Sequence, residues 1–214
     1  MTSEENLRRL VCNLASGYQA LNEAGIIHRD IKPENCLIVY ESAKTQGPNP
    51  YGNFKLAKIA DFGSSKISEE ANGVMAGTLA GTPLYMAPEV GANVVQSSAY
   101  NAQIDMWSLG CLLYQSAVGH APFDETALCR LFLQSSTGSY DAYRPPNMPE
   151  NVPTYARSLI KALLTLDPEK RLRPAQLCSQ AAALSGDWGW RKWEWLLAKQ
   201  LLAYIRDQLS AGIS

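Results

Sequence analysis

The sequence lacks several features that mark whole classes of protein. Its five cysteines are scattered without a Cys-x-x-Cys pair, which argues against a disulfide framework or a zinc site and favours a reducing compartment. The formal net charge is only -1, so nothing indicates nucleic acid as a partner. No apolar run approaches the roughly 20 residues that a membrane span needs, and the polar, acidic N-terminus is unlike a signal peptide. These absences predict a cytoplasmic or nuclear protein.

The composition favours one folded domain. Hydrophobic residues make up 46% of the 214 residues and charged residues 18%, which is enough apolar surface for one sizeable core. Thr2 and Glu5 have the spacing of a capping box, so a helix should begin there and end near Gly25. Its apolar stripe consists of Leu7, Leu10, Val11, Leu14, Tyr18 and Leu21.

Three more helices are predicted in the second half of the chain. Residues 104–118 are apolar nearly all round, which is typical of a helix that is buried on most faces. Pro174 suits the first turn of a later helix. Between these two, a second helical stripe is formed by Val152, Ala156, Leu159, Ile160, Leu163 and Leu164.

Two short apolar runs predict a β-hairpin. Residues 36–40 and 54–59 have strand length, and residues 41–53 between them contain proline and glycine, as a loop does. Residues 64–81 are small, polar and without periodicity, so we expect a mobile segment there.

The residues best suited to chemistry lie on the loop before this hairpin. Residues 28–35 read His-Arg-Asp-Ile-Lys-Pro-Glu-Asn. In this loop Asp30 can accept a hydroxyl proton, Lys32 can bind a phosphate oxygen and Asn35 can bind a metal ion. Asp61, in an Asp-Phe-Gly sequence directly after the second strand, can face the same loop. Two oxygen ligands from adjacent loops suit Mg²⁺, which keeps its other positions for phosphates and water.

Three later motifs follow in a recognisable order. Residues 81–89 read Gly-Thr-Pro-Leu-Tyr-Met-Ala-Pro-Glu, residues 105–110 read Asp-Met-Trp-Ser-Leu-Gly, and residues 166–171 read Leu-Asp-Pro-Glu-Lys-Arg. Together with residues 28–35 and 61–63, they resemble the motifs of eukaryotic protein kinases. Lys32 after Asp30, and Thr82 before a proline, are similar to the serine/threonine kinases. The wording of residues 81–89 is similar to the autophagy-initiating unc-51-like branch.

The resemblance implies a fold and an activity. The fold would be mainly α (α+β), with the family's large lobe over residues 1–180, a hairpin beside the catalytic loop and a Trp-rich helical tail over residues 181–214. The activity would be phosphoryl transfer from Mg-ATP to a serine or threonine of a protein substrate. Asp30 would orient and deprotonate the hydroxyl, and Lys32 would stabilise charge on the transferred group. The residues implied in binding ATP are Lys32, Glu34, Asn35, Leu37 and Asp61, of which Asn35 and Asp61 would bind Mg²⁺ and Leu37 would lie beneath the adenine.

Other matched residues are expected to be structural. We expect His28 to pack near Phe62 rather than to shuttle protons. The resemblance pairs Glu89 with Arg171 and makes Asp105 a buried scaffold residue at the start of the central helix. Loss of one partner of a buried ion pair leaves the other charged and unpaired, which is costly.

The resemblance also implies regulation by phosphorylation. Arg29 beside Asp30 is the family's mark of a kinase whose mobile segment is phosphorylated, because a phosphate there gives the arginine a charged partner. Thr78 is the candidate phosphosite, with Ser64, Ser65 and Ser68 behind it, and Thr82 lies in the same segment. The alternative is that these are ordinary polar loop residues.

The tail differs from the rest of the chain, because Trp188, Trp190, Trp193 and Trp195 crowd into a short stretch. Core packing is the first interpretation of this cluster, and a partner surface is the alternative, since tryptophan is favoured at interfaces.

No Gly-x-Gly-x-x-Gly sequence precedes His28, so we expect the family's small β-rich lobe to be missing. Two hypotheses follow. The sequence is a truncated part of a protein kinase, or it is a catalytically weak lobe that acts as a binding or regulatory module. In either case residues 1–214 alone should bind Mg-ATP weakly and phosphorylate a generic substrate negligibly.

Overall fold

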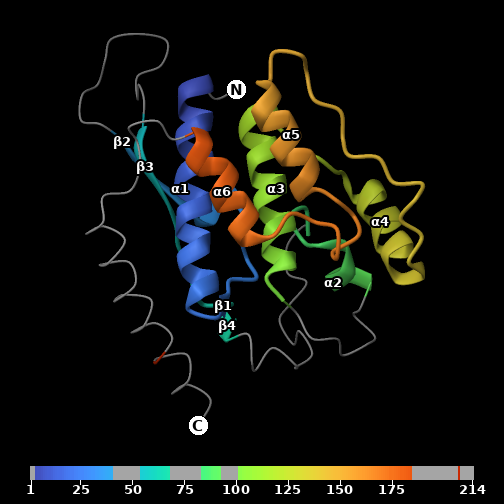
Figure 1. The fold of residues 1–214 in the computed structure, drawn as a ribbon. Coiled ribbons are helices and arrows are strands. Elements are labelled where there is room, and N and C mark those ends of the chain that lie inside the picture. Colours follow the sequence, from blue (N-terminus) through green and yellow to red (C-terminus); the bar gives the residue numbers. More distant parts are fainter. Residues whose placement is uncertain (1–2, 41–53, 68–82, 93–100, 185–206, 208–214) are drawn as a thin grey trace.

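The computed structural model describes residues 3–40, 54–67, 83–92, 101–184 and 207, and over this range the chain is mainly helical, as predicted (Figure 1). Helices α1 (Glu4–Glu23) and α3 (Gln103–Val118) lie side by side at the centre. Helix α6 (Pro174–Leu184) packs against α1, and α5 (Thr154–Leu163) packs against α3. The core lies between these four helices.

Helix α1 begins one residue later than its predicted cap. Ser3 is the N-cap, and its side chain accepts a hydrogen bond from the backbone N–H of Asn6 at 3.2 Å. The N-cap is therefore one residue after the predicted Thr2, which lies outside the described residues, and Glu5 pairs with Arg9 at 2.7 Å. All six residues of the predicted apolar stripe are buried. The helix ends before Gly25, whose φ of 70° is readily adopted by glycine.

The chain leaves α1 into a very short sheet. Strand β1 (Ile26–Ile27) pairs antiparallel with β4 (Lys66–Ile67), which places Ile26 opposite Ile67. Neither strand was predicted, and only a mobile segment was expected from residue 64, because two residues are too few to show a period. Residues 68–82 lie outside the described part of the chain.

The predicted hairpin has the predicted bounds. Strands β2 (Cys36–Tyr40) and β3 (Phe54–Ile59) pair antiparallel, and the loop predicted between them lies outside the described residues. Val39 lies opposite Leu56 and Tyr40 lies opposite Phe54, so Lys55 is an extra residue on β3. Such a bulge bends the strand and changes which residues point to one side.

The helices predicted around residues 104–118, 152–164 and 174 are present with buried faces, whereas two others were missed. Helix α2 (Pro88–Ala92) packs against α4 (Glu125–Thr137). The ends of α4 carried readable signals: Asp124 accepts a hydrogen bond from Ala127 N–H at 2.7 Å, and Gly138 follows the helix with φ 67°. Only Leu128 and Leu131 of α4 are buried, so its stripe was too weak to stand out.

A buried ion pair joins α2 to the rest of the helices. The Nη1 and Nη2 atoms of Arg171 donate to the two carboxylate oxygens of Glu89 at 2.6 and 3.0 Å, and the Arg171 side chain is 0% exposed. Its guanidinium also lies over the Trp107 ring, 5.1 Å from the centroid. Its remaining hydrogen bonds go to the backbone oxygens of Gln103, Thr165 and Leu166. The guanidinium therefore has a partner for each nitrogen.

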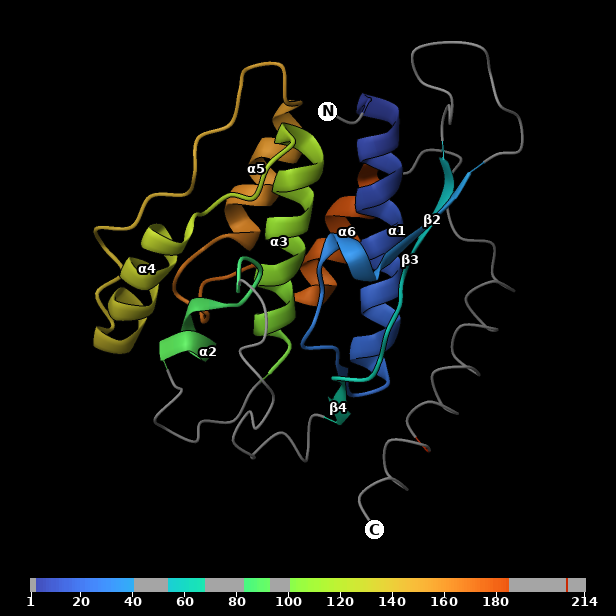
Figure 2. The ribbon, with the colours of Figure 1, turned by 180° about the vertical axis from the view of Figure 1, so that it is seen from behind.

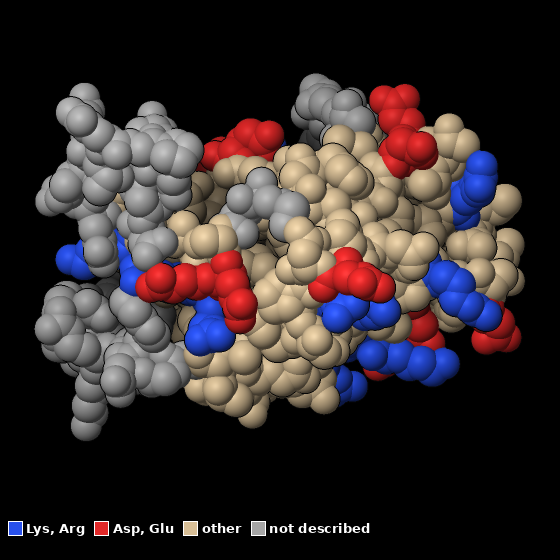
Figure 3. Space-filling view, turned by 90° about the horizontal axis from the view of Figure 1, so that it is seen from above, with Lys and Arg blue, Asp and Glu red and all other residues tan. Residues whose placement is uncertain are grey.

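Charges of both signs are mixed on the face of the molecule that Figure 3 shows. In the view of Figure 3, acidic and basic side chains lie next to one another over the described part of the molecule. None of the helices that the structure describes is long and apolar enough to cross a membrane. The Trp188–Trp195 cluster lies outside the described residues, so the domain boundary at residue 180 and the role of the tail stay predictions.

Two helical glycines give a matched test of this packing. A Cβ added at Gly110 of α3 would lie 2.9 Å from Leu163 Cβ, whereas one added at Gly17 of α1 would meet no atom within 4 Å. We expect Gly110→Ala to lower the free energy of unfolding by about 1–3 kcal/mol through overpacking. Gly17→Ala should raise it by about 0.5–1 kcal/mol, since alanine loses less conformational entropy in a helix. Urea unfolding measures both, and equal shifts of the same sign would contradict this packing.

The buried ion pair gives a second test. Glu89→Ala leaves the Arg171 guanidinium buried without its counter-charge, and we expect the free energy of unfolding to fall by about 3–5 kcal/mol. The control is Glu4→Ala, which removes an exposed pair with Arg8 at 3.3 Å and should cost about 1 kcal/mol or less. Similar losses in the two variants would show that Arg171 does not depend on Glu89.

Candidate active site

Asp105 of α3 fixes the backbone at the start of the loop at residues 28–35. The N–H groups of His28 and Arg29 donate to the two oxygens of the Asp105 carboxylate at 2.7 and 2.8 Å, and Asp105 is fully buried. Arg29 has a φ of 70°, which a residue with a side chain rarely adopts. The pair of hydrogen bonds stabilises this conformation and so fixes the direction in which the chain continues to Asp30.

A third donor reaches the same carboxylate from α1. The Tyr18 hydroxyl donates to Asp105 Oδ2 at 3.0 Å. Burial raises the pKa of Asp105, and the hydrogen bonds from Arg29, His28 and Tyr18 oppose that rise. Burial and the neighbouring carboxylate raise the pKa of Tyr18 well above its ordinary value, so its hydroxyl remains a donor. Tyr18 was predicted only as part of the apolar stripe of α1, although a buried tyrosine hydroxyl needs a hydrogen-bond partner.

His28 links this loop to the chain before Asp61. Its ring lies 5.2 Å from the ring of Phe62 in an edge-on arrangement, and it is fully buried. Nδ1 lies 3.4 Å from the backbone N–H of Asp30, and Nε2 lies 3.0 Å from the backbone oxygen of Ala60. Because the Asp30 N–H can only donate, Nδ1 accepts and Nε2 carries the proton that is donated to Ala60. Both ring nitrogens therefore have structural partners.

The carboxylate of Asp30 lies between a cation and an amide. Lys32 Nζ donates to its two oxygens at 3.0 and 2.8 Å, and Asn35 Nδ2 donates to Oδ2 at 2.8 Å. The hydrogen bond to Asp30 raises the pKa of Lys32, so the ammonium is charged at neutral pH. The side chains of Asp30 and Lys32 are each 35% exposed, which leaves both accessible to a substrate. A short 3₁₀ turn at Pro33–Asn35 brings Asn35 back to Asp30.

Asp61 follows β3 beside Asn35. The backbone N–H of Ala60 donates to the backbone oxygen of Asn35 at 2.9 Å, so the two loops are joined directly before Asp61. Asp61 has a φ of 64°, and its Oδ1 accepts a hydrogen bond from the N–H of Gly63 at 3.2 Å. Its carboxylate is close enough to Lys32 to raise the pKa of that ammonium further.

The donors present at this point fit Mg²⁺. Asn35 uses its Nδ2 for Asp30, so its amide oxygen is the atom left to face a cation, and Asp61 adds a carboxylate. The described residues contain no cluster of three or more His, Cys, Asp or Glu side chains that could enclose a metal ion. A site with one amide and one carboxylate suits Mg²⁺, which usually takes few protein ligands and keeps water and phosphate oxygens.

The other predicted nucleotide-binding residues lie around this centre. Glu34 is exposed in the 3₁₀ turn, and Leu37 on β2 is 56% exposed, so an apolar ligand could cover it. Cys36 directly precedes Leu37 on β2. Burial raises the pKa of its thiol to about 11, so the thiol stays protonated at neutral pH.

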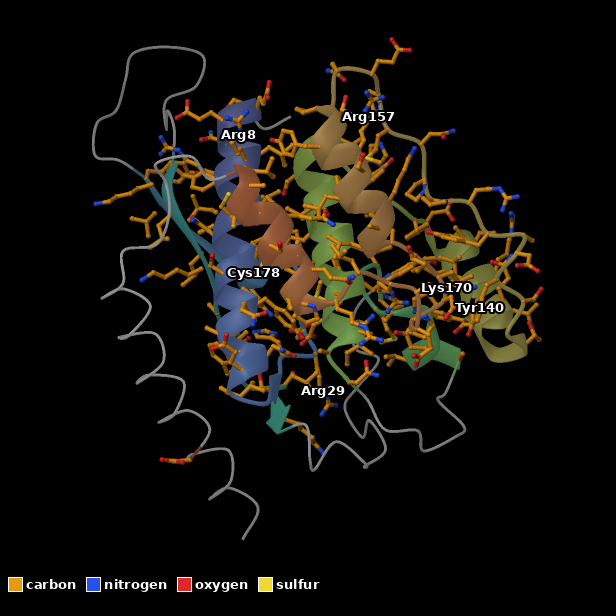
Figure 4. The ribbon with its side chains drawn as sticks, viewed as in Figure 1. Arg8, Arg29, Tyr140, Arg157, Lys170 and Cys178 are labelled. Carbon is orange, nitrogen blue, oxygen red and sulfur yellow. The ribbon has the colours of Figure 1, made fainter. Side chains whose placement is uncertain are left out.

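Of the residues predicted to take part in regulation, Arg29, Ser64 and Ser65 lie in the described part of the chain. Arg29 lies at the end of the molecule where β1 and β4 meet (Figure 4). Its Nε is buried and has no hydrogen-bond partner among the described residues. Thr78 and Thr82, like Ser68, lie outside the described part of the chain. Ser65 is described, and its buried hydroxyl donates to the backbone oxygen of His28 at 3.4 Å.

Comparison with known proteins identifies the family of this chain. The protein kinase domain family matches residues 1–181. Serine/threonine-protein kinase unc-51 of Caenorhabditis elegans is 37% identical over 172 residues, which cover 79% of this chain and 18% of that protein. Serine/threonine-protein kinase ULK1 of Homo sapiens is 34% identical over 172 residues, covering 79% and 15%. Calcium/calmodulin-dependent protein kinase type IV of Mus musculus is 37% identical over 175 residues, covering 81% and 34%.

The chain thus spans between 15% and 34% of the length of these three relatives. The match to the family covers most of this chain and includes the loop around Asp30, the Asp61 turn and the Glu89–Arg171 pair. The chain belongs to the protein kinase family.

Proposed function

We propose that the protein is an ATP-dependent serine/threonine kinase and that residues 1–214 contain the large lobe of its catalytic domain. The observation that carries the proposal is the Asp30 carboxylate, which Lys32 and Asn35 fix at 2.8–3.0 Å beside the Asp61 turn. Phosphoryl transfer needs a carboxylate that accepts the hydroxyl proton, a fixed cation and oxygen ligands for a metal ion, and these residues supply all three. The named serine/threonine kinases among the relatives support the same activity.

Asp30 is the group that would receive the substrate hydroxyl. Its Oδ2 already accepts from both Lys32 and Asn35, whereas Oδ1 accepts from Lys32. A hydroxyl that donates to Oδ1 is oriented toward the phosphate and can pass its proton to the carboxylate as its oxygen bonds to the γ-phosphorus and the bond from that phosphorus to ADP breaks. Lys32 is near enough to move from Asp30 toward the transferred group and to stabilise its charge.

Asn35 and Asp61 would hold Mg²⁺, which would supply positive charge against the ATP phosphates. The chain's own part is to fix these two side chains in space. Leu37 on β2 would contact the adenine, and Glu34 lies in the 3₁₀ turn directly before this strand. Because Leu37 is 56% exposed, we expect residues 1–214 alone to bind Mg-ATP weakly, and a weakly active binding or regulatory module is the alternative for this length of chain.

Further observations support the proposed regulation, location and subfamily of the protein. The buried Nε of Arg29, unpartnered among the described residues, supports a phosphate on the segment around Thr78 as its partner. All five cysteines are free thiols, which supports a cytoplasmic or nuclear protein. The unc-51-like branch is favoured by the wording of residues 81–89 and by two of the relatives.

The direct test of the activity is Asp30→Asn, assayed in the longest form of the protein that the cell produces. Transfer of labelled phosphate from Mg-ATP to a mixed protein substrate should fall by roughly a hundred- to ten-thousand-fold, because the amide cannot accept the hydroxyl proton. Asp141→Asn, an exposed aspartate on a distant loop, is the matched control and should leave the rate unchanged. A wild-type rate in Asp30→Asn would contradict the proposed role of Asp30.

A further inference from the structure

A row of polar side chains on α1 contacts the edge of β3, away from the groups assigned to catalysis. Asn13 Oδ1 accepts a hydrogen bond from the backbone N–H of Ala57 at 2.8 Å. One end of the strand is bound in the same way, since Phe54 N–H donates to Asn6 Oδ1 at 3.3 Å and Arg9 Nη1 donates to Phe54 O at 2.7 Å. Their spacing places the three side chains on one side of the helix. Figures 1 and 2 both show β3 running beside α1.

These contacts replace a third strand. Strand β3 pairs with β2 along one edge, and its other edge has backbone groups that need partners when they are buried. The bulge at Lys55 makes the arrangement possible, because in a regular strand residues 54 and 57 would point their N–H groups to opposite edges. With the extra residue, both Phe54 and Ala57 direct their N–H groups to α1, and both residues are buried.

The strand leads directly to Asp61. Ala57 is bound by Asn13, and three residues later Ala60 is bound through its N–H to Asn35 and through its oxygen to His28. Asp61 then adopts its φ of 64°. A residue with a side chain keeps such a conformation only where its surroundings fix the chain on either side. The Asn13 contact is the part of this fixation that comes from α1.

We propose that Asn13 is a positioning residue for Asp61, and that Asn6 and Arg9 support it by fixing the start of β3. By this mechanism α1 determines how the Asp61 carboxylate is presented to the cation of a Mg-nucleotide. The consequence for the cation rests on the proposed function. The consequence for the backbone of residues 57–63 does not.

The backbone consequence is tested by amide hydrogen exchange without nucleotide or metal. Asn13→Leu removes the acceptor, Asn13→Asp keeps an acceptor oxygen, and Asn22→Leu makes the same change at an exposed position of α1. Exchange in residues 57–63 should rise roughly tenfold in Asn13→Leu, as expected for the loss of about one hydrogen bond. It should stay near the wild-type rate in the other two variants. Unchanged exchange at residues 61–63 in Asn13→Leu would overturn the proposal.

The cation consequence is tested by the affinity for ADP, measured by calorimetry with Mg²⁺ and with a chelator, in the longest form of the protein that the cell produces. A positioning role predicts that Asn13→Leu leaves the affinity without Mg²⁺ unchanged and removes most of the gain that Mg²⁺ gives, and Asp61→Ala should have the same effect. Asn13→Asp should restore that gain. Equal weakening with and without Mg²⁺ would indicate a general structural defect and overturn the positioning role.

The two experiments separate this inference from the proposed function. If ADP binding by the unaltered protein does not depend on Mg²⁺, the proposed function fails at its metal site. Faster exchange at residues 61–63 in Asn13→Leu would then still support Asn13 as the residue that fixes Asp61.

Discussion

The buried carboxylate of Asp105 is the constraint on which the site depends. A charge without access to water is tolerated only when donors surround it. Here the donors are the N–H groups of His28 and Arg29 and the hydroxyl of Tyr18. They come from α1 and from the loop after β1, while Asp105 itself belongs to α3. The requirement to satisfy one carboxylate therefore fixes two central helices and the loop at residues 28–35 relative to one another.

A second buried charge, of opposite sign, lies against the start of α3. Arg171 binds Glu89, contacts the Trp107 ring and donates to Gln103 O, so the start of α3 is tied to α2 and to the chain before α6. The rest of α3 is apolar nearly all round and buried. The helix thus supplies core packing along most of its length, and the charged groups that position other segments against it lie at its first turns.

The parts of the fold that the sequence predicted are those with a long pattern. The stripes of α1 and α5 and the apolar runs of β2 and β3 repeat often enough to be recognised, whereas α2, β1 and β4 are too short and α4 buries too few residues. The motifs identified Asp30, Lys32, Asn35 and Asp61 by resemblance. They gave no sign of Tyr18 or Asn13, because each makes its contact with a residue far away in the sequence, and only the folded chain brings those residues together.

Arg29 and Asp61, one on each side of the proposed site, both have positive φ angles without being glycine. Each is fixed by hydrogen bonds that the helices direct at the neighbouring backbone, through Asp105 at Arg29 and through Asn13 at the strand before Asp61. His28 joins the two arrangements, since its N–H donates to Asp105 and its ring donates to Ala60. Two unfavourable conformations are thus stabilised by one connected set of contacts that needs no ligand. The helices, rather than the small sheets, therefore determine the geometry of the proposed site.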